Sequence, residues 1–212
     1  MKRVLVACEE SQEVCKAFRE LGFEAYSCDI QECSGGHPEW HIQDDVLKHL
    51  DENWDLIIAH PPCTYLSNAG ACRMYKVING VHYISVERYM KMLQGKEFFM
   101  SMINAPCDHI AVENPTPLKI CELPKHSQVI QPYEFGHPYS KRTLLWIKNL
   151  PLLKPSNILT DHVPYLPSNT SNFAKGLGGG RGVVRGSKNY SKTFPGIAKA
   201  MAEQWGSYIL GD

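Results

Sequence analysis

The chain has 212 residues, of which 43% are hydrophobic, and its 22 basic and 22 acidic side chains give no net charge. We expect residues 1–212 to form a single domain, because this length suits one well-buried core. The lack of net charge excludes the strongly basic field that supports tight, indiscriminate binding to nucleic acid. No apolar stretch approaches the roughly 18 residues of a membrane-spanning helix, and Glu9 and Glu10 interrupt the first apolar run, which argues against a signal peptide. The 8 cysteines are therefore expected to stay reduced in the cytoplasm.

Strand and helix patterns alternate along the first half of the chain. Apolar runs bounded by polar residues predict strands at 3–8, 24–28, 54–59 and 109–112. Apolar residues at helical spacing predict helices at 11–21, 45–50 and 86–103, and Gly22 closes the first of them. This alternation is typical of an α/β fold with a doubly wound, mostly parallel sheet.

The second half of the chain is less regular. Two β segments are predicted at 132–135 and 143–147, and a helix at 193–210 with Pro195 near its first turn. Residues 150–190 are rich in glycine and proline, and we expect a loop there. Between 150 and 192 one carboxylate, Asp161, is set against the basic residues Lys154, Lys175, Arg181, Arg185, Lys188 and Lys192. The loop is a basic segment on a neutral protein.

Polar residues follow four of the predicted strands. They are Glu9, Asp29, the run from His60 to Cys63 and the run from Glu113 to Pro115. Ligands of doubly wound sheets bind beyond the carboxyl ends of the strands. We therefore expect these groups to meet at one crevice.

The segment IIAHPPC ends a buried strand with two prolines and Cys63. Taken alone, this cysteine could be structural, a metal ligand or a nucleophile. The prolines fix φ at two successive positions, and an attacking thiolate needs such stiffness. Buried structural cysteines are common, but a Pro-Pro step suits the ligand edge of the sheet better than its core. The local sequence therefore favours a nucleophile.

Two further stretches are weak signals by themselves. Glu113, in VENP, could be an exposed turn residue, or a carboxyl group that holds a heterocycle and moves its proton. The Lys141-Arg142 pair, in SKRTLLWI, could be a solvated turn, or Arg142 could pair with a substrate oxygen or phosphate.

Four residues suit zinc by type: Cys28, Cys33, His37 and His41. Their spacing matches no common zinc module. We interpret the segment as a loop with incidental ligands and predict no metal site.

HPPCTYLS, VENP and SKRTLLWI, in this order, resemble the nucleophile loop, the Glu-Asn motif and the arginine-bearing strand of the DNA cytosine-5 methyltransferase family. The tail KTFPGIAKAMAEQW is similar to the last helix of that family, and the resemblance covers about residues 3–149 and 190–206. It extends to small members encoded by phages and prophages. It implies a Rossmann-like methyltransferase fold with S-adenosylmethionine as cofactor.

The resemblance also implies a role for each motif. Cys63 would add to carbon 6 of a cytosine, which makes carbon 5 nucleophilic enough to accept a methyl group. Glu113 would contact ring nitrogen 3 and the exocyclic amine, and Arg142 would help to hold the base. Because a base inside a duplex is out of reach, it must be extruded or arrive single-stranded.

The cofactor pocket implied by the resemblance comprises Ala7, Cys8, Glu9, Asp29, Ile30, Asp45 and Pro61. Asp44 is an alternative to Asp45 beside the adenine. The family has a glycine-rich first turn, whereas this turn reads ACEESQ and contains no glycine. Its two glutamates would repel the carboxylate of the cofactor. An altered cofactor and a non-catalytic protein therefore stay open as alternatives.

The family's target-recognition region is reduced here to residues 150–190, whose composition suits phosphates better than base edges. We expect low sequence specificity, unless a homo-oligomer or a partner protein supplies it. DNA, single- or double-stranded, is the expected partner; RNA or a free pyrimidine nucleotide is the alternative substrate, and a non-catalytic module that binds DNA or protein is the alternative function. The expected nucleic-acid contacts are Ser67, Lys175, Arg181, Arg185 and Lys188.

Overall fold

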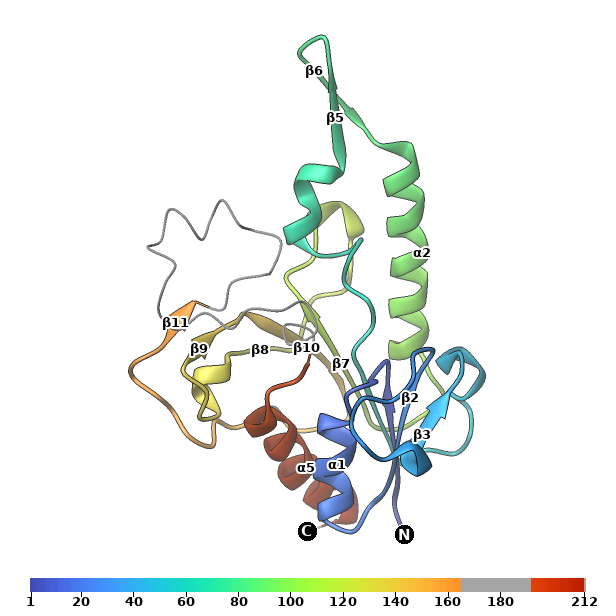
Figure 1. The fold of residues 1–212 in the computed structure, drawn as a ribbon, viewed down its shortest axis with the longest axis vertical. Coiled ribbons are helices and arrows are strands. Elements are labelled where there is room, and N and C mark those ends of the chain that lie inside the picture. Colours follow the sequence, from blue (N-terminus) through green and yellow to red (C-terminus); the bar gives the residue numbers. More distant parts are fainter. Residues whose placement is uncertain (165–191, 212) are drawn as a thin grey trace.

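A computed structural model describes residues 1–164 and 192–211 of the chain. Within them a seven-stranded sheet has the strand order β3-β2-β1-β4-β7-β10-β8 (Figure 1). β10 runs antiparallel to both of its neighbours, and the other pairings are parallel. The strands are β1 (Arg3–Ala7), β2 (Glu24–Asp29), β3 (His41–Gln43), β4 (Leu56–Ala59), β7 (Ile110–Pro115), β8 (Gln128–Ile130) and β10 (Thr143–Lys148).

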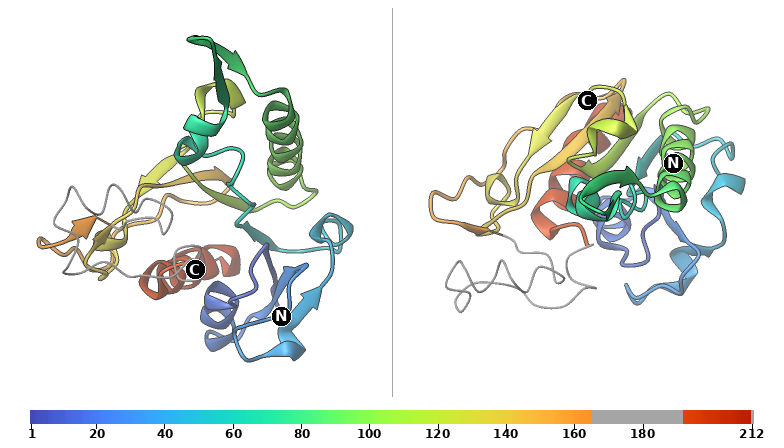
Figure 2. Two further views of the ribbon diagram at one scale, coloured as in Figure 1. Left: turned by 45° about the horizontal axis from the view of Figure 1, so that its top comes forward. Right: turned by 90° about the horizontal axis from the view of Figure 1, so that it is seen from above.

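Helices cover both faces of this sheet. α1 (Glu13–Glu20) and α5 (Pro195–Leu210) pack against each other on one face, and α2 (Val86–Ile103) packs on the other, apart from both (Figure 2). Successive residues of β1 point to opposite faces, so Val6 joins the first core and Leu5 the second. The predicted α/β fold with a doubly wound, mostly parallel sheet is confirmed.

Smaller elements connect these parts. A two-stranded hairpin, β5 (Tyr75–Ile78) and β6 (Val81–Ile84), lies outside the main sheet, as do β9 (Tyr139–Ser140) and β11 (Val163–Pro164). The 3₁₀ helices are η1 (Pro38–Trp40), η2 (Val46–Lys48), η3 (Asn68–Arg73), η4 (Lys119–Cys121) and η5 (Pro132–Glu134). None of the helices in the described part of the chain is long and apolar enough to cross a membrane.

The predicted β segment at 132–135 is wrong. Residues Pro132–Glu134 form the 3₁₀ helix η5, and β10 pairs instead with β8. Pro132 has no N–H to give to a sheet and is favoured in the first turn of a helix. The Glu134 carboxylate accepts from the Gln131 N–H at 2.6 Å, which caps the start of that turn.

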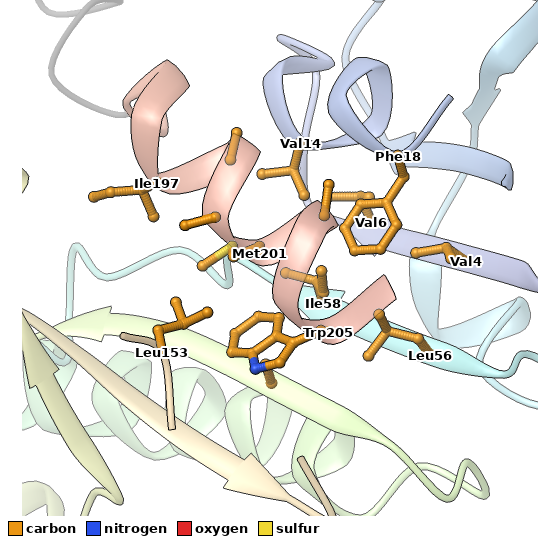
Figure 3. Packing of buried hydrophobic residues seen from close by; sticks show 14 of the residues in the cluster. Val4, Val6, Val14, Phe18, Leu56, Ile58, Leu153, Ile197, Met201 and Trp205 are labelled. Carbon is orange, nitrogen blue, oxygen red and sulfur yellow. The ribbon is translucent and has the colours of Figure 1, made fainter. Parts of the chain in front are cut away.

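Trp205 anchors the core between α5 and the sheet. Its side chain is fully buried, and Figure 3 shows it among Leu56, Ile58 and Leu153. Its indole N–H donates to the Pro151 carbonyl at 2.9 Å, which satisfies the one polar atom of the ring. The residue thus joins the last helix to the segment that leaves β10.

Trp205→Ala is expected to lower the free energy of unfolding by about 3–5 kcal/mol, because it leaves a large cavity and an unpaired carbonyl. Urea unfolding monitored by circular dichroism measures the change. Leu210→Ala, at an exposed position of the same helix, is the control and should change stability by less than about 0.5 kcal/mol. Equal losses in both variants would contradict the packing assigned to Trp205.

Candidate active site at the carboxyl edge of the sheet

The strand order reverses direction between β1 and β4, which are neighbours in the sheet. Such a switch point opens a crevice beyond the carboxyl ends of the two strands. Two pockets lie there. One, of about 390 Å³, is lined by Glu9, His60 and Thr193 among others. The other, of about 600 Å³, extends between the end of β2 and α2, and both pockets share Cys8, Asp29 and Pro62.

The first turn closes without glycine because two other residues adopt left-handed backbone. Cys8 has φ 59° and Gln12 has φ 58°, conformations that cost a non-glycine residue roughly 1–2 kcal/mol each. The buried Gln12 side chain offsets this cost with hydrogen bonds to the Ser27 hydroxyl at 3.2 Å and the His37 carbonyl at 2.8 Å. Its amide oxygen accepts from the His37 N–H at 3.1 Å. The turn is therefore braced against the β2–β3 connection.

Glu9 occupies the N-terminus of α1. Its carboxylate accepts hydrogen bonds from the backbone N–H groups of Val14, at 2.7 Å, and Cys15, at 3.1 Å. These are two of the four N–H groups that a helix start leaves without a partner, and they favour an anion. Burial raises the pKa of Glu9, while nearby His60 and these two N–H groups lower it. The chain thus fills with its own carboxylate the place where a helix of this fold could bind an anionic ligand.

The larger pocket has acidic and apolar walls. Its lining includes Asp29 and Ile30 at the end of β2 and Phe98 of α2. Asp45 also lines the pocket and accepts from the Leu47 N–H at 3.1 Å to cap η2. An exposed Asp44 bonds Lys48 at 2.7 Å, and this contact lowers the pKa of Asp44 to about 2. Carboxylates that accept from sugar hydroxyls, beside apolar walls for a base, fit the adenosine part of S-adenosylmethionine.

The methionine part of that cofactor finds a different environment. The smaller pocket is lined by four carboxylates and one lysine, namely Glu9, Glu10, Asp29, Glu32 and Lys192. Carboxylates suit an ammonium or sulfonium group and repel a carboxylate. The residues present therefore fit the adenosine and the two cationic groups of S-adenosylmethionine better than its carboxylate.

The loop that carries Cys63 is fastened to the end of β7. The Cys63 carbonyl accepts from the Ser67 N–H at 2.8 Å, and the Asn68 N–H donates to the Thr116 carbonyl at 2.8 Å. The buried Asn114 amide reaches the Pro61 carbonyl at 3.4 Å. Two segments that are about fifty residues apart in sequence thus form one rigid platform, on which the Glu113 charge is close enough to act on the pKa of Cys63.

The charges around Cys63 and Glu113 are coupled. Burial and the Glu113 carboxylate raise the pKa of the Cys63 thiol, and Lys141 and the Ser67 hydroxyl lower it less. Burial opposes ionisation of Glu113, but His60 and Lys141 prevail and hold its pKa below the usual value. At neutral pH the resting pair is therefore a thiol next to a carboxylate.

His60 joins this pair to the cofactor side of the crevice. Its Nδ1 lies 3.5 Å from a Glu113 carboxylate oxygen, and its side chain is 10% exposed. Its Nε2 is buried without a hydrogen-bond partner among the described residues. The ring lines both the pocket beside Glu9 and the small cavity beside Glu113 and Lys141. The sequence pattern places His60 at this crevice and Lys141 next to Arg142, but it gives neither residue a role.

The other predicted site residues do not all lie at the crevice. Arg142 is exposed, and Lys141, not Arg142, lines the cavity with Glu113. Ala7 and Pro61 are buried at strand ends. Ser67 is also buried, against Cys63. The remaining nucleic-acid contacts lie outside the described residues: Lys175, Arg181, Arg185 and Lys188. The assigned roles stay predictions.

The zinc-type residues have other partners. The Cys33 thiol contacts the Gln12 amide oxygen at 3.2 Å, His41 bonds the Ser27 hydroxyl at 2.8 Å, and His37 stacks on Trp40. Across residues 1–164 and 192–211, no group of three or more histidine, cysteine or acidic side chains is placed to hold a metal ion.

No protein-family model matches this chain, and no curated protein matches it either. Solved structures that are similar include a protein assigned as a DNA modification methyltransferase encoded within a prophage of Escherichia coli (13% identity, TM-score 0.46, 75% of this chain and 52% of that one). Others are a variant of DNMT2 from Spodoptera frugiperda (16%, 0.38, 79% and 56%) and the methyltransferase EhMeth of Entamoeba histolytica (16%, 0.43, 76% and 56%).

The chain thus spans just over half the length of each of these proteins. The fold is assigned from the sheet itself. The order of its parallel strands switches direction between β1 and β4, helices lie on both faces, and one antiparallel strand is inserted near the edge. The chain has a Rossmann-like α/β fold.

Proposed function

We propose that this chain is an S-adenosylmethionine-dependent methyltransferase that acts on carbon 5 of cytosine in DNA through a covalent adduct with Cys63. The observation that carries the proposal is that the loop of Cys63 is bonded to the end of β7 by Asn68 and Asn114. There burial and the Glu113 carboxylate raise the pKa of Cys63, and Lys141 lowers the pKa of both groups. A cofactor-sized pocket is lined by Pro62 and Tyr65, which flank Cys63 in the same loop. The resemblance of the three sequence motifs gives the same two residues the same roles.

The proton balance of this pair suits conjugate addition to a pyrimidine. The Cys63 thiol is protonated and Glu113 is ionised, so the sulfur can give its proton to the carboxylate as it bonds to carbon 6. Glu113 then passes this proton to ring nitrogen 3, and the electron pair moves to carbon 5. When bound, S-adenosylmethionine supplies the electrophilic methyl group.

Release of the product reverses the first steps. A base removes the proton from carbon 5, the bond between carbon 6 and Cys63 breaks, and the ring regains its double bond. Glu113 takes back the proton from nitrogen 3 and returns it to the departing sulfur. His60, between Glu113 and the pocket beside Glu9, holds the carboxylate in position throughout.

One observation favours a second candidate, a non-catalytic module that binds DNA or protein. The Glu9 carboxylate already fills the N-terminus of α1, and the cofactor's carboxylate cannot use that site. A chain that no longer binds the cofactor could retain the fold and the surface of an enzyme.

Nucleoside mass spectrometry separates these candidates. The protein would be incubated with S-adenosylmethionine and, in separate reactions, duplex DNA, single-stranded DNA, RNA and dCMP. New 5-methylcytosine in DNA is the expected result, and methylation confined to RNA or dCMP would change the substrate. If none of the four substrates is modified while the protein still binds DNA, the result supports the non-catalytic binding module and contradicts the methyltransferase.

A further inference from the structure

The β5–β6 hairpin projects from the body of the protein, beyond η3 and the start of α2 (Figure 1). All eight of its strand residues are exposed. Val77 is 60% exposed, Ile78 55% and Val81 51%. A free hairpin is marginally stable in water, and contiguous apolar surface of this kind marks a binding site.

The hairpin has no polar face. Tyr75 pairs with Ile84 and Val77 with His82 on one side, while Lys76 pairs with Tyr83 and Ile78 with Val81 on the other. Cross-strand partners share a face, so aromatic or branched apolar side chains emerge on both faces. An element that is apolar on both faces suits insertion between two surfaces of a partner.

The charge of this region selects the kind of partner. Arg73 and Lys76 flank or belong to β5, and from Leu56 to Val86 the sequence contains no aspartate or glutamate. Glu87 follows at the start of α2, pairs with Lys91 at 2.9 Å and lies near enough to Lys76 to interact with its charge, so the cations of the region still outnumber its acidic groups. A second copy of the chain would bring like charges together, which opposes self-association through the hairpin. Nucleic acid offers phosphates to the cations and flat bases to the apolar side chains.

The hairpin is joined rigidly to the loop of Cys63. The Ser85 N–H donates to the Met74 carbonyl at 2.8 Å at the base of the hairpin, and Met74 is fully buried. In the first turn of α2, Arg88 donates to the Thr64 carbonyl at 2.8 Å and covers the Tyr65 ring. A partner held by the hairpin is thereby held in register with Cys63.

We propose that the β5–β6 hairpin is a nucleic-acid-binding wedge: Arg73 and Lys76 contact phosphates, and the apolar tip packs against bases beside the one presented to Cys63. A two-stranded ribbon fits the major groove of a duplex, and apolar side chains can separate stacked bases. The inference rests on the proposed function for its substrate class. It assigns to this hairpin nucleic-acid contacts that the sequence predicts mainly in residues 150–190.

Binding of a fluorescently labelled DNA duplex, measured by anisotropy without cofactor over a range of salt concentrations, tests the wedge. Ile78→Ser combined with Val81→Ser is expected to weaken binding about tenfold or more, since base-packing contacts contribute roughly 1–3 kcal/mol each. The salt dependence should stay unchanged in this variant. Lys76→Gln is expected to reduce the slope of log K against log salt by about 1, because one phosphate contact is lost.

Matched variants lie far from the hairpin. Leu21→Ser removes an exposed apolar side chain at the end of α1, and Lys199→Gln removes an exposed cation of α5; neither should alter DNA binding. All variants should unfold at the wild-type temperature, because the replaced side chains are exposed. Wild-type affinity and slope in the hairpin variants would overturn the proposal, as would a loss of dimers in sedimentation without a loss of DNA binding. Because no methyl transfer is measured, these results stand apart from the test of the proposed function.

Discussion

Cys63→Ala is expected to reduce methylation of cytosine by at least about a thousandfold, because the substrate then has no nucleophile to activate its carbon 5. Cys63→Ser should be similarly inactive, since an unassisted hydroxyl is a far weaker nucleophile than a thiolate. The Cys63 side chain contributes little to the core and its loop is held by backbone bonds to Ser67 and by Asn114. The variants should therefore fold and bind DNA as the wild-type protein does.

A covalent-trapping measurement gives this prediction a second readout. In DNA that carries 5-fluorocytosine, carbon 5 bears fluorine in place of the proton that must leave before Cys63 is expelled. The wild-type protein should therefore remain attached to the DNA after methyl transfer and migrate as an adduct in a denaturing gel. Cys107→Ala, at the opposite edge of the sheet just before β7, is the matched control and should retain both activities. An adduct in the Cys63 variants would assign the nucleophile to another residue.

The sequence was informative where burial alone decides the structure. Apolar runs predicted the parallel strands, and the residues after them met at one edge because parallel strands share an orientation. The site was harder to predict where the outcome depends on which face a side chain takes. Thr143 is buried at the start of β10 and lines the cavity beside Glu113. Lys141, two residues earlier, lines the same cavity, whereas Arg142 between them is exposed.

Other features required long-range contacts or an overlooked turn. His60 can be recognised as part of the site only from its interactions with Glu9 and Glu113, which lie about fifty residues away on either side in sequence. The β5–β6 hairpin did have a local signal, Asn79-Gly80 between β-rich segments, with both residues at positive φ. Its exposed apolar strands resembled neither an amphipathic strand nor a buried one, so periodicity did not reveal them.

Glu113→Gln is expected to change two measurements in opposite directions. Methylation should fall by about 10²–10⁴-fold, since glutamine can neither accept the thiol proton nor deliver one to ring nitrogen 3. Alkylation of Cys63 by iodoacetamide should instead become faster at neutral pH. The Glu113 charge raises the pKa of Cys63, so removing that charge lowers this pKa and increases the fraction of thiolate.

The sign of this effect depends on pH in a defined way. The pKa of Glu113 lies below its usual value, so the carboxylate is ionised throughout the neutral range and the acceleration should be present there. It should disappear at high pH, where Cys63 is a thiolate in both proteins. Peptide mass spectrometry of the alkylated Cys63 peptide against pH measures both limits, with Glu20→Gln at the exposed end of α1 as control. Slower methylation with unchanged alkylation would mean that Glu113 positions the base without being coupled to Cys63. Slower methylation of cytosine together with faster alkylation of Cys63 is expected only if the Glu113 carboxylate both raises the pKa of the thiol and receives its proton.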